Sequence, residues 1–259
     1  MWLDLVYLNL FLMLSSWLIV TYNQRAGLVD VTWSLCIAIN AIFLAVTLNQ
    51  APLMIRCFIG LASGLWFLRL FWHLLRRYLS ETEEDTRYAT MRRAMGRWQH
   101  VGFFAFFMFQ AALALLFAYP MLNILTIPQS QWGSFSSLAL TVSAAVMLVA
   151  FMGEVIADQQ LYDFKKQPEN QGLTMDQGLW KYSRHPNYFF EWLHWFAYPI
   201  LALAAGQYIL WIYPVLMWFF LHYITGIPFS EQQALRHRGE NYQHYQQRTS
   251  MFIPWPPKQ

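Results

Sequence analysis

Long apolar runs dominate this sequence, and they decide what it can fold into. Seven of them cover approximately residues 2–21, 29–48, 53–75, 101–122, 136–157, 189–205 and 208–226. Each is close to the roughly 20 residues that a helix needs to cross about 30 Å of hydrocarbon. Backbone groups in lipid must be satisfied internally, and no run shows the alternation of a barrel strand. The runs therefore predict an all-α, polytopic membrane bundle of seven transmembrane helices.

Composition excludes the main soluble alternatives. Hydrophobic residues make up 57% of the chain and charged residues 12%, against about 25% charged in soluble proteins. A net charge of +3 is too small to indicate nucleic-acid binding. The first apolar run begins at Met1 without a basic segment, so we expect a retained anchor rather than a cleaved signal peptide. No repeat or long linker divides the chain, which predicts one domain over residues 1–259.

The distribution of cations predicts an orientation. Lysine and arginine gather in residues 76–100, in residues 158–188 and in the tail after residue 226, while the alternate loops carry almost none. Cytoplasmic loops of membrane proteins are enriched in these residues. We therefore expect the N-terminus outside and the C-terminus in the cytoplasm, in a bacterial inner membrane.

The same basic segments also carry carboxylates and amides. Cations alone are explained by topology and by contacts with anionic lipid head groups. The acids and amides favour a polar, anionic ligand that spans several loops. A metal is not predicted, because Cys36 and Cys57 lack ligand spacing and His194 and His222 lie singly within apolar runs.

Two constellations stand out in the second half of the chain. Glu154 and Asp158 are four residues apart at the end of the fifth run, on one helix face. A structural pairing of Glu154 and a ligand-lining role are equally open. Residues 181–188 read KYSRHPNY, and Glu191 follows. Pro186 favours a helix start there, where backbone N–H groups attract anions, and Asn187 and Glu191 share one face of that helix.

The C-terminal segment completes a pattern that resembles the steroid 5-alpha-reductase family, including its bacterial members. The resemblance covers roughly residues 65–259 and uses the string 182–188 with Glu191, the Glu154/Asp158 helix end, Glu231, the tail ENY at 240–242 and the closing RTSMFIPW. It implies seven transmembrane helices and NADPH bound from the cytoplasmic side. The chain has no G-x-G-x-x-G string, so a Rossmann fold cannot supply dinucleotide binding.

The resemblance also assigns residues to the cofactor. It implies that Asn187 and Glu191 are catalytic residues beside the nicotinamide, with Asn187 also binding the cofactor. The remaining implied cofactor residues are Arg69, His73, Asp85, Arg87, Tyr88, Asp158, Lys165, Lys166, Tyr182, Arg184, His185, Glu231, Arg236 and Tyr242. Arginine and lysine side chains suit the adenosine phosphates.

A catalytic acid is expected in the second run. The resemblance implies that the reaction is the reduction of an enone, which leaves negative charge on the carbonyl oxygen, and an acid must polarise that oxygen. The segment from Arg25 to Trp33 loosely matches the family segment that holds this acid, so Asp30 is the expected group, protonated at membrane depth. The alternative is a helix-end residue paired with Arg25. Trp66 stands where the family has a substrate-polarising tyrosine, and Asp30, Trp33 and Trp66 are the expected substrate contacts.

Three functions compete at this stage. The first is an NADPH-dependent reductase of a conjugated C=C bond, with a 3-oxo-Δ4 steroid as the expected lipophilic substrate. The second is an S-adenosylmethionine-dependent methyltransferase of the isoprenylcysteine type, which carries a similar RHPxY string. The third is a lipid-binding or scaffolding protein. Asn187 within the string, together with Glu191, favours the reductase.

Overall fold

A computed structural model describes residues 2–224 and 226–258. It is 80% helix, and these residues contain no strand, which confirms the all-α prediction. Within them, six helices are long and apolar enough to cross a membrane. The chain is therefore an integral membrane protein. Its helices gather into two compact units, Met1–Gln131 and Trp132–Gln259, which we call unit 1 and unit 2. The prediction of a single domain stays a prediction.

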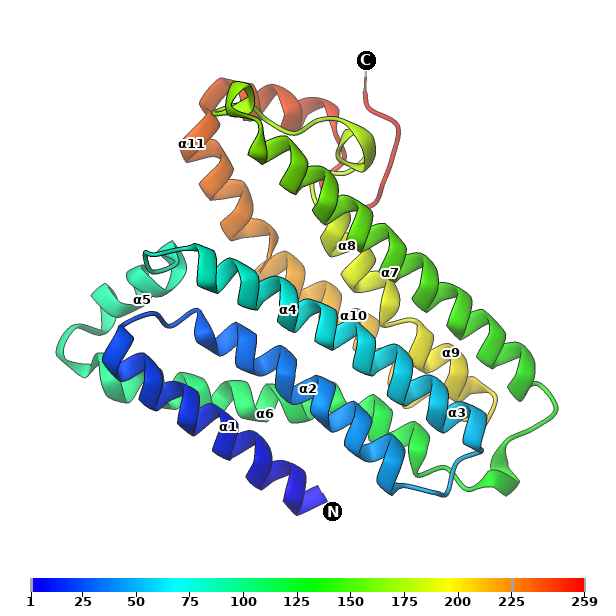
Figure 1. Cartoon of the computed structure of the whole chain (residues 1–259). Coiled ribbons are helices and arrows are strands. Elements are labelled where there is room, and N and C mark those ends of the chain that lie inside the picture. The colour runs from blue at the N-terminus through cyan, green and yellow to red at the C-terminus, as the bar shows by residue number, and fades with distance from the viewer. Residues whose placement is uncertain (1, 225, 259) are drawn as a thin grey trace. The chain divides into compact units, whose positions relative to one another are not determined.

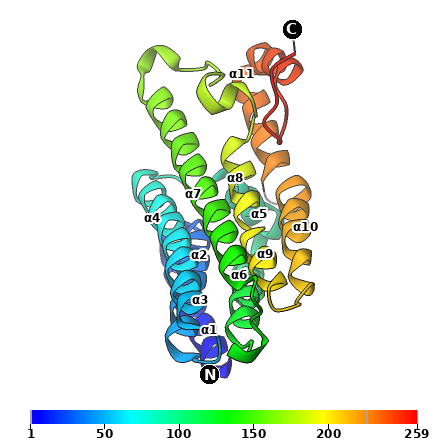
Figure 2. The same cartoon turned by 90° about the vertical axis from the view of Figure 1, so that its right-hand side faces the viewer.

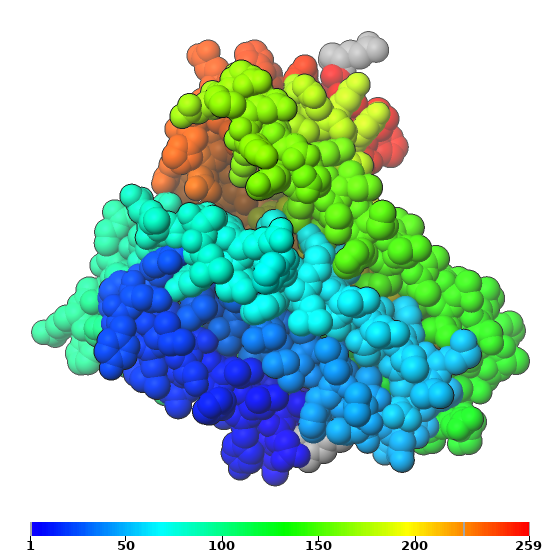
Figure 3. Space-filling view, viewed as in Figure 1, coloured from blue at the N-terminus to red at the C-terminus, as the bar shows by residue number. Residues whose placement is uncertain are grey.

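Unit 1 is built around α2 (Leu28–Thr47). This helix packs against α1 (Trp2–Asn23), against α6 (Gln99–Leu125), and against the helical stretch of α3 (Leu53–Phe58), a π-helical turn (Ile59–Ser63) and α4 (Gly64–Ser80) (Figure 1). A Cβ on Gly60 would lie 2.8 Å from that of Ala45, so glycine permits the close approach to α2. Figure 3 shows the side chains of α1, α2 and α4 packed into one surface.

Polar contacts also tie α1 to α2 inside the apolar unit. Asn9 Nδ2 donates to Asn40 Oδ1 over 2.9 Å, and Asn40 donates back to Asn9 over 3.3 Å. The hydroxyls of Ser16 and Thr32 lie 2.6 Å apart. Because an unsatisfied amide in hydrocarbon is costly, these pairs fix how the two helices face each other.

A short polar helix, α5 (Thr86–Met95), joins α4 to α6. The Asp85 side chain caps it by accepting the backbone N–H of Arg87 over 2.9 Å. Gly96, with φ of +51°, ends it and lets the chain turn into α6. The polar residues of α5 therefore lie close to the start of α2.

Unit 2 is built on α7 (Ser136–Lys166), which packs against α8 (Pro186–His194) and α9 (Ala197–Leu203) (Figure 2). Gly153 allows this, because a Cβ there would meet the Phe190 ring at 2.3 Å. The chain continues through α10 (Ile212–Phe219), a π-helical turn (Phe220–Ile224) and α11 (Ile227–Arg248). The helix α11 bends at Gly239, where φ is +51°.

The predicted span 189–205 is divided between α8 and α9. The break falls at Trp195 and Phe196, whose backbone N–H groups bond three residues back rather than four. Pro199 explains it, because a proline lacks the N–H that would bond to the Trp195 carbonyl, and its ring crowds that carbonyl. The predicted span 208–226 includes residue 225, which lies outside the described residues.

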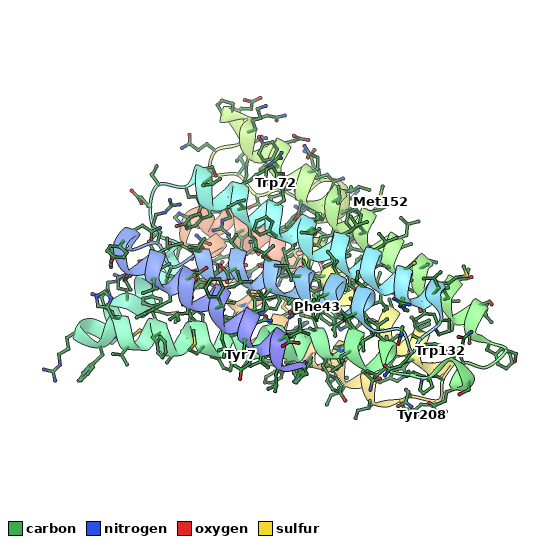
Figure 4. All side chains as sticks on the ribbon, turned by 60° about the horizontal axis from the view of Figure 1, so that its bottom comes forward. Tyr7, Phe43, Trp72, Trp132, Met152 and Tyr208 are labelled. Carbon is green, nitrogen blue, oxygen red and sulfur yellow. The ribbon has the colours of Figure 1, made fainter. Side chains whose placement is uncertain are left out.

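Large apolar side chains stand on the outside of the long helices in both units. Tyr7 on α1, Trp72 on α4 and Met152 on α7 are all exposed and are labelled in Figure 4. Tyr208, at the start of the segment before α10, is exposed as well. A soluble protein rarely carries so many such residues in contiguous patches, whereas lipid accommodates them.

Candidate functional site

Unit 1 holds a cluster centred on Asp30, in the first turn of α2. Arg87 Nη2 donates to Asp30 Oδ2 over 3.0 Å, and the Tyr88 hydroxyl donates to Asp30 Oδ1 over 2.8 Å. Arg87 also donates from Nε to Asp85 Oδ1 over 3.1 Å. We call Asp30, Asp85, Arg87 and Tyr88 the Asp30 cluster. Three residues predicted for the cofactor and one predicted for catalysis are thus brought together.

The electrostatics of this cluster favour the ionised form of Asp85. Burial acts to raise the pKa of Asp85, but the hydrogen bonds and charge of Arg87, helped by Arg77, outweigh it and lower that pKa. Both oxygens of Asp30 accept hydrogen bonds, one from Arg87 and one from Tyr88. The prediction of Asp30 as a protonated donor stays a prediction.

A second ion-pair network next to this cluster was not predicted from the sequence. Arg92 donates to both oxygens of Glu84 over 2.9 Å, and to the backbone oxygen of Gln24 over 3.0 Å. Arg25 donates to the backbone oxygens of Tyr78 and Glu81 at the end of α4. Arg25 is thus hydrogen-bonded to the end of α4. The alternative interpretation, in which Arg25 pairs with Asp30, differs from this arrangement. The mixture of acidic and basic residues over 81–93 was the sequence feature from which such an ion-pair network could have been predicted.

A hollow in unit 1 opens onto the Asp30 cluster. Its charged lining consists of five carboxylates and three arginines, contributed by Arg25, Asp30, Arg77, Glu81, Glu83, Glu84, Asp85 and Arg87. An excess of carboxylates repels phosphate. The hollow therefore suits a neutral polar group better than the phosphates of a nucleotide.

The remaining predicted residues of unit 1 lie along α2 and α4. Trp66 is fully buried, and Trp33 meets the rings of Phe67 and Phe117 edge-on, at centroid distances of 6.2 and 5.8 Å. Arg69, partly buried, and His73, exposed, are four residues apart and share one face of α4. Trp66 is thus a core residue, and Trp33, which is partly buried, packs against aromatic rings of the same apolar interior.

Unit 2 holds a second cluster, centred on Glu231 near the start of α11. Its Oε1 accepts from Arg184 Nε at 2.8 Å, from His185 Nε2 at 2.9 Å and from the Tyr242 hydroxyl at 2.9 Å. Its Oε2 accepts from Arg184 Nη2 at 3.2 Å and from Gln246 Nε2. We call these five residues the Glu231 cluster. Four of them were predicted for the cofactor, and Gln246 was missed.

The Glu231 cluster is closed on itself. Five donors on one carboxylate exceed its roughly four lone-pair sites, so Glu231 has no capacity left for a ligand. Arg184 is committed as well, because its Nη1 donates to the backbone oxygens of Gln246 and Thr249. Burial lowers the pKa of His185, although the hydrogen bond and charge of Glu231 oppose this. The neutral His185 ring stacks on Tyr188 at 5.4 Å.

Further contacts bind the C-terminal tail to the segment before α8. The Ser183 hydroxyl donates to the Phe252 oxygen over 2.7 Å, and the Arg184 N–H donates to the Ser250 oxygen over 2.8 Å. The hydroxyl of Tyr245 donates to the Trp180 and Ser183 oxygens. These partners lie more than 60 residues apart in sequence, so no local pattern could have revealed them.

The other predicted residues of unit 2 lie on α7, α8 and α11 and in the segment before α8. Asn187 Nδ2 donates to Asp158 Oδ1 over 3.3 Å, which joins two predicted residues. Glu191 accepts from Trp195 Nε1 over 3.4 Å and lies 3.9 Å from His194 Nδ1. Glu154 is buried on α7. Exposed positions are held by Lys165, Lys166, Tyr182 and Arg236. In residues 2–224 and 226–258, no group of three or more His, Cys, Asp or Glu side chains is arranged to hold a metal ion.

The comparisons with known proteins give a family but no activity. The profile described as "Protein of unknown function (DUF1295)" matches residues 16–249, so the chain belongs to the DUF1295 family. An uncharacterized protein of Schizosaccharomyces pombe is 23% identical over 218 residues. The match covers 74% of this chain and 61% of the length of that yeast protein. No solved structure matches the chain.

Proposed function

We propose that this DUF1295 protein is an NADPH-dependent membrane reductase related to the steroid 5-alpha-reductases. Its substrate is an apolar enone, foremost a 3-oxo-Δ4 steroid, whose conjugated C=C bond is reduced in the 5α sense. The proposal rests on the Asp30 cluster. There a tyrosine hydroxyl and an arginine converge on one carboxylate at the end of an apolar helix, with distances of 2.8 and 3.0 Å.

Such a cluster has the groups that enone reduction requires. NADPH, when bound, would supply the hydride that the β-carbon of the enone gains, and the carbonyl oxygen would then carry negative charge. Tyr88 carries an O–H donor and Arg87 carries N–H donors. These groups can stabilise this charge when the substrate displaces them from Asp30. Asp30 holds the two donors in place, and the proton that the α-carbon must gain to complete the reduction comes from water. The aromatic interior around Trp33 and Trp66 suits a flat apolar ring system.

The residues of unit 2 fit the cofactor by their chemistry. Asp158 and Asn187, joined by a hydrogen bond, present a carboxylate and an amide that suit ribose hydroxyls and the nicotinamide carboxamide. Lys165, Lys166 and Arg236 are exposed cations that suit phosphates. Glu191 lies on the same helix face as Asn187. The Glu231 cluster, being saturated, holds this surface together rather than binding the cofactor itself.

A topology accompanies this proposal. We propose that α8 and α9 together form a seventh span, in addition to the six long apolar helices. The N-terminus then lies outside, and the three basic segments lie on the cytoplasmic side. In a bacterium this places the protein in the inner membrane, with its lipophilic substrate supplied by the bilayer.

Ligand-dependent unfolding tests the reductase against the methyltransferase. Purified protein in detergent is heated with NADPH, with NADH and with S-adenosylmethionine. A ligand that binds the native state raises the unfolding temperature, so NADPH is expected to do so and S-adenosylmethionine is not. Stabilisation by S-adenosylmethionine alone would reverse the choice. Stabilisation by neither ligand would favour a lipid-binding or scaffolding protein.

Turnover provides the direct test. NADPH oxidation is followed by absorbance with a 3-oxo-Δ4 steroid and, as the matched control, with the corresponding saturated ketone. Only the enone is expected to be consumed, because the saturated ketone has no conjugated β-carbon. Consumption of both at equal rates would indicate carbonyl reduction and contradict the proposed reaction.

A further inference from the structure

A second hollow lies entirely within unit 2, between the last turn of α11 and the tail that follows it. It is lined by Arg184, Gln246, Gln247, Arg248, Thr249, Ser250, Met251, Trp255, Pro256 and Lys258. None of these lining residues is a carboxylate, whereas the hollow of unit 1 has five. The two hollows therefore differ in the sign of the charge that they attract.

Two of the three lining cations are open to a ligand. Arg184 is already neutralised by Glu231, from which it lies 2.8 Å. Arg248 makes one exposed ion pair, from Nη2 to Asp176 Oδ2 over 3.1 Å, and exposed pairs of this kind are weak. The backbone N–H of Lys258 donates to the Arg248 oxygen over 2.8 Å, which keeps the two cationic residues adjacent. A guanidinium beside an ammonium suits a phosphate.

An open aromatic ring borders these cations. The Trp255 side chain is 69% exposed, although its backbone is fixed, since its N–H donates to the Tyr182 oxygen over 2.9 Å. An exposed indole on a backbone that is held in place offers a stacking surface for a nucleic base. Cations and a stacking ring in one hollow match a ligand that carries both a phosphate and a flat base.

We propose that this hollow binds the adenosine 2′-phosphate end of NADPH. Arg248 and Lys258 contact the phosphomonoester, and the adenine ring stacks on Trp255. The inference rests on the proposed function, which it deepens by naming the residues that separate NADPH from NADH. A lipid such as phosphatidic acid shares the phosphomonoester chemistry, so the test must distinguish a nucleotide from a head group.

The test is calorimetry on the full chain in nanodiscs of zwitterionic lipid, with adenosine 2′,5′-bisphosphate and 5′-AMP as probes. Wild-type protein is expected to prefer the bisphosphate. Arg248→Ala and Lys258→Ala should each weaken bisphosphate binding about tenfold, because each removes a charge-assisted contact, and should leave 5′-AMP binding almost unchanged. Trp255→Ala should weaken both probes, and Trp255→Phe should restore them.

Two controls match these variants. Asp176→Ala breaks the same ion pair as Arg248→Ala but leaves the guanidinium in place, so bisphosphate affinity should persist or rise. Arg93→Ala removes an exposed cation of α5, which donates to Ala89 and Thr90 of its own helix. Equal losses in the Asp176 and Arg248 variants would show that the ion pair matters for folding alone and would overturn the assignment.

The remaining outcomes separate the two proposals. A further measurement is the binding of phosphatidic acid to the wild type and to the Arg248 and Lys258 variants. If this binding depends on Arg248 and Lys258, while the bisphosphate binds all variants equally, the hollow belongs to a lipid head group instead. If the enone is reduced but the variants keep the wild-type preference for NADPH over NADH, the hollow is wrong and the reductase stands. Bisphosphate binding lost in the variants, without any reduction of enones, would support the hollow and contradict the reductase.

Discussion

Two carboxylates, one in each unit, meet an arginine and a tyrosine, yet they are held very differently. Asp30 in unit 1 accepts from two donors, and its side chain is 28% exposed. Glu231 in unit 2 accepts five hydrogen bonds, and its side chain is 13% exposed. The first carboxylate keeps unused acceptor capacity at a hollow, and the second has none.

This difference indicates which carboxylate can react and which one holds the structure together. A carboxylate with spare lone pairs and solvent access can exchange a partner for a ligand, whereas a saturated one exchanges a partner only at the cost of breaking its cluster. Asp30 is therefore the carboxylate suited to chemistry. Glu231 is suited to fixing the tail against the segment that precedes α8. The predictions below test this division.

Replacing Glu231 should cause the largest loss of stability. Glu231→Ala leaves the charge of Arg184 and the donors of His185 and Tyr242 without their acceptor, which we expect to cost about 3–5 kcal/mol. Thermal unfolding in detergent measures it. Glu240→Ala, an exposed carboxylate on the same helix, should unfold like the wild type. A Glu231 variant as stable as the Glu240 variant would contradict the anchoring role.

Replacing Asp30 should affect turnover far more than stability. Asp30→Asn removes the charge that holds Arg87 and Tyr88 in place as donors to the enolate oxygen, so enone reduction should fall about 100-fold. The partly exposed ion pair between Arg87 and Asp30 contributes about 1 kcal/mol or less to folding. Steady-state kinetics with parallel unfolding curves measure both quantities. Wild-type turnover in Asp30→Asn would give this residue a purely structural role.

The two tyrosines sharpen the same contrast with a smaller change. Tyr88→Phe and Tyr242→Phe each remove one hydrogen bond to a carboxylate, which should cost about 1–2 kcal/mol of stability in each case. Only Tyr88→Phe is expected to slow reduction, by about tenfold or more. Equal turnover in the two variants would remove the distinction between the clusters.

Dependence on pH should give the smallest effect and should differ between the clusters. The lowered pKa of His185 means that the folded state binds fewer protons than the unfolded state, so stability falls as the pH drops below 6.5. Because the pKa of Asp85 is lowered in the folded state, this carboxylate stabilises the fold above its ordinary pKa of 3.8. That contribution is lost as the pH falls below 3.8.

Two variants isolate these contributions in pH-dependent unfolding. His185→Gln should flatten the dependence just below the ordinary histidine pKa, and Asp85→Asn should flatten only the more acidic part. His185→Gln with an unchanged slope near neutral pH would show that another group titrates there.

Much of the fold was predictable because it depends on local sequence. The apolar run 29–48 became α2 within one residue at each end, since backbone groups in lipid have few alternatives to a helix, and the run 136–157 became the larger part of α7, which continues to Lys166. The helix start at Pro186 was predicted for the same local reason. The division of residues 189–205 was missed, although Pro199 was its signal.

The candidate sites were predictable in membership but not in role. Asp85, Arg87 and Tyr88 were expected near a ligand, and the structure joins them to Asp30. Arg184, His185, Glu231 and Tyr242 were expected to bind a cofactor, and they bind one another. A residue type shows which bonds are possible, while the partners present decide which bonds remain available.

The sequence by itself determined that this chain is an α-helical integral membrane protein and where its polar segments lie. Hydrophobicity and helix period act over a few turns, and the cost of an unpaired backbone group in lipid is the same in every fold. Only the tertiary structure decided that Glu231 is saturated while Asp30 is not. The donors that separate these two carboxylates come from positions up to 58 residues distant in the chain, and only folding brings them within hydrogen-bond range.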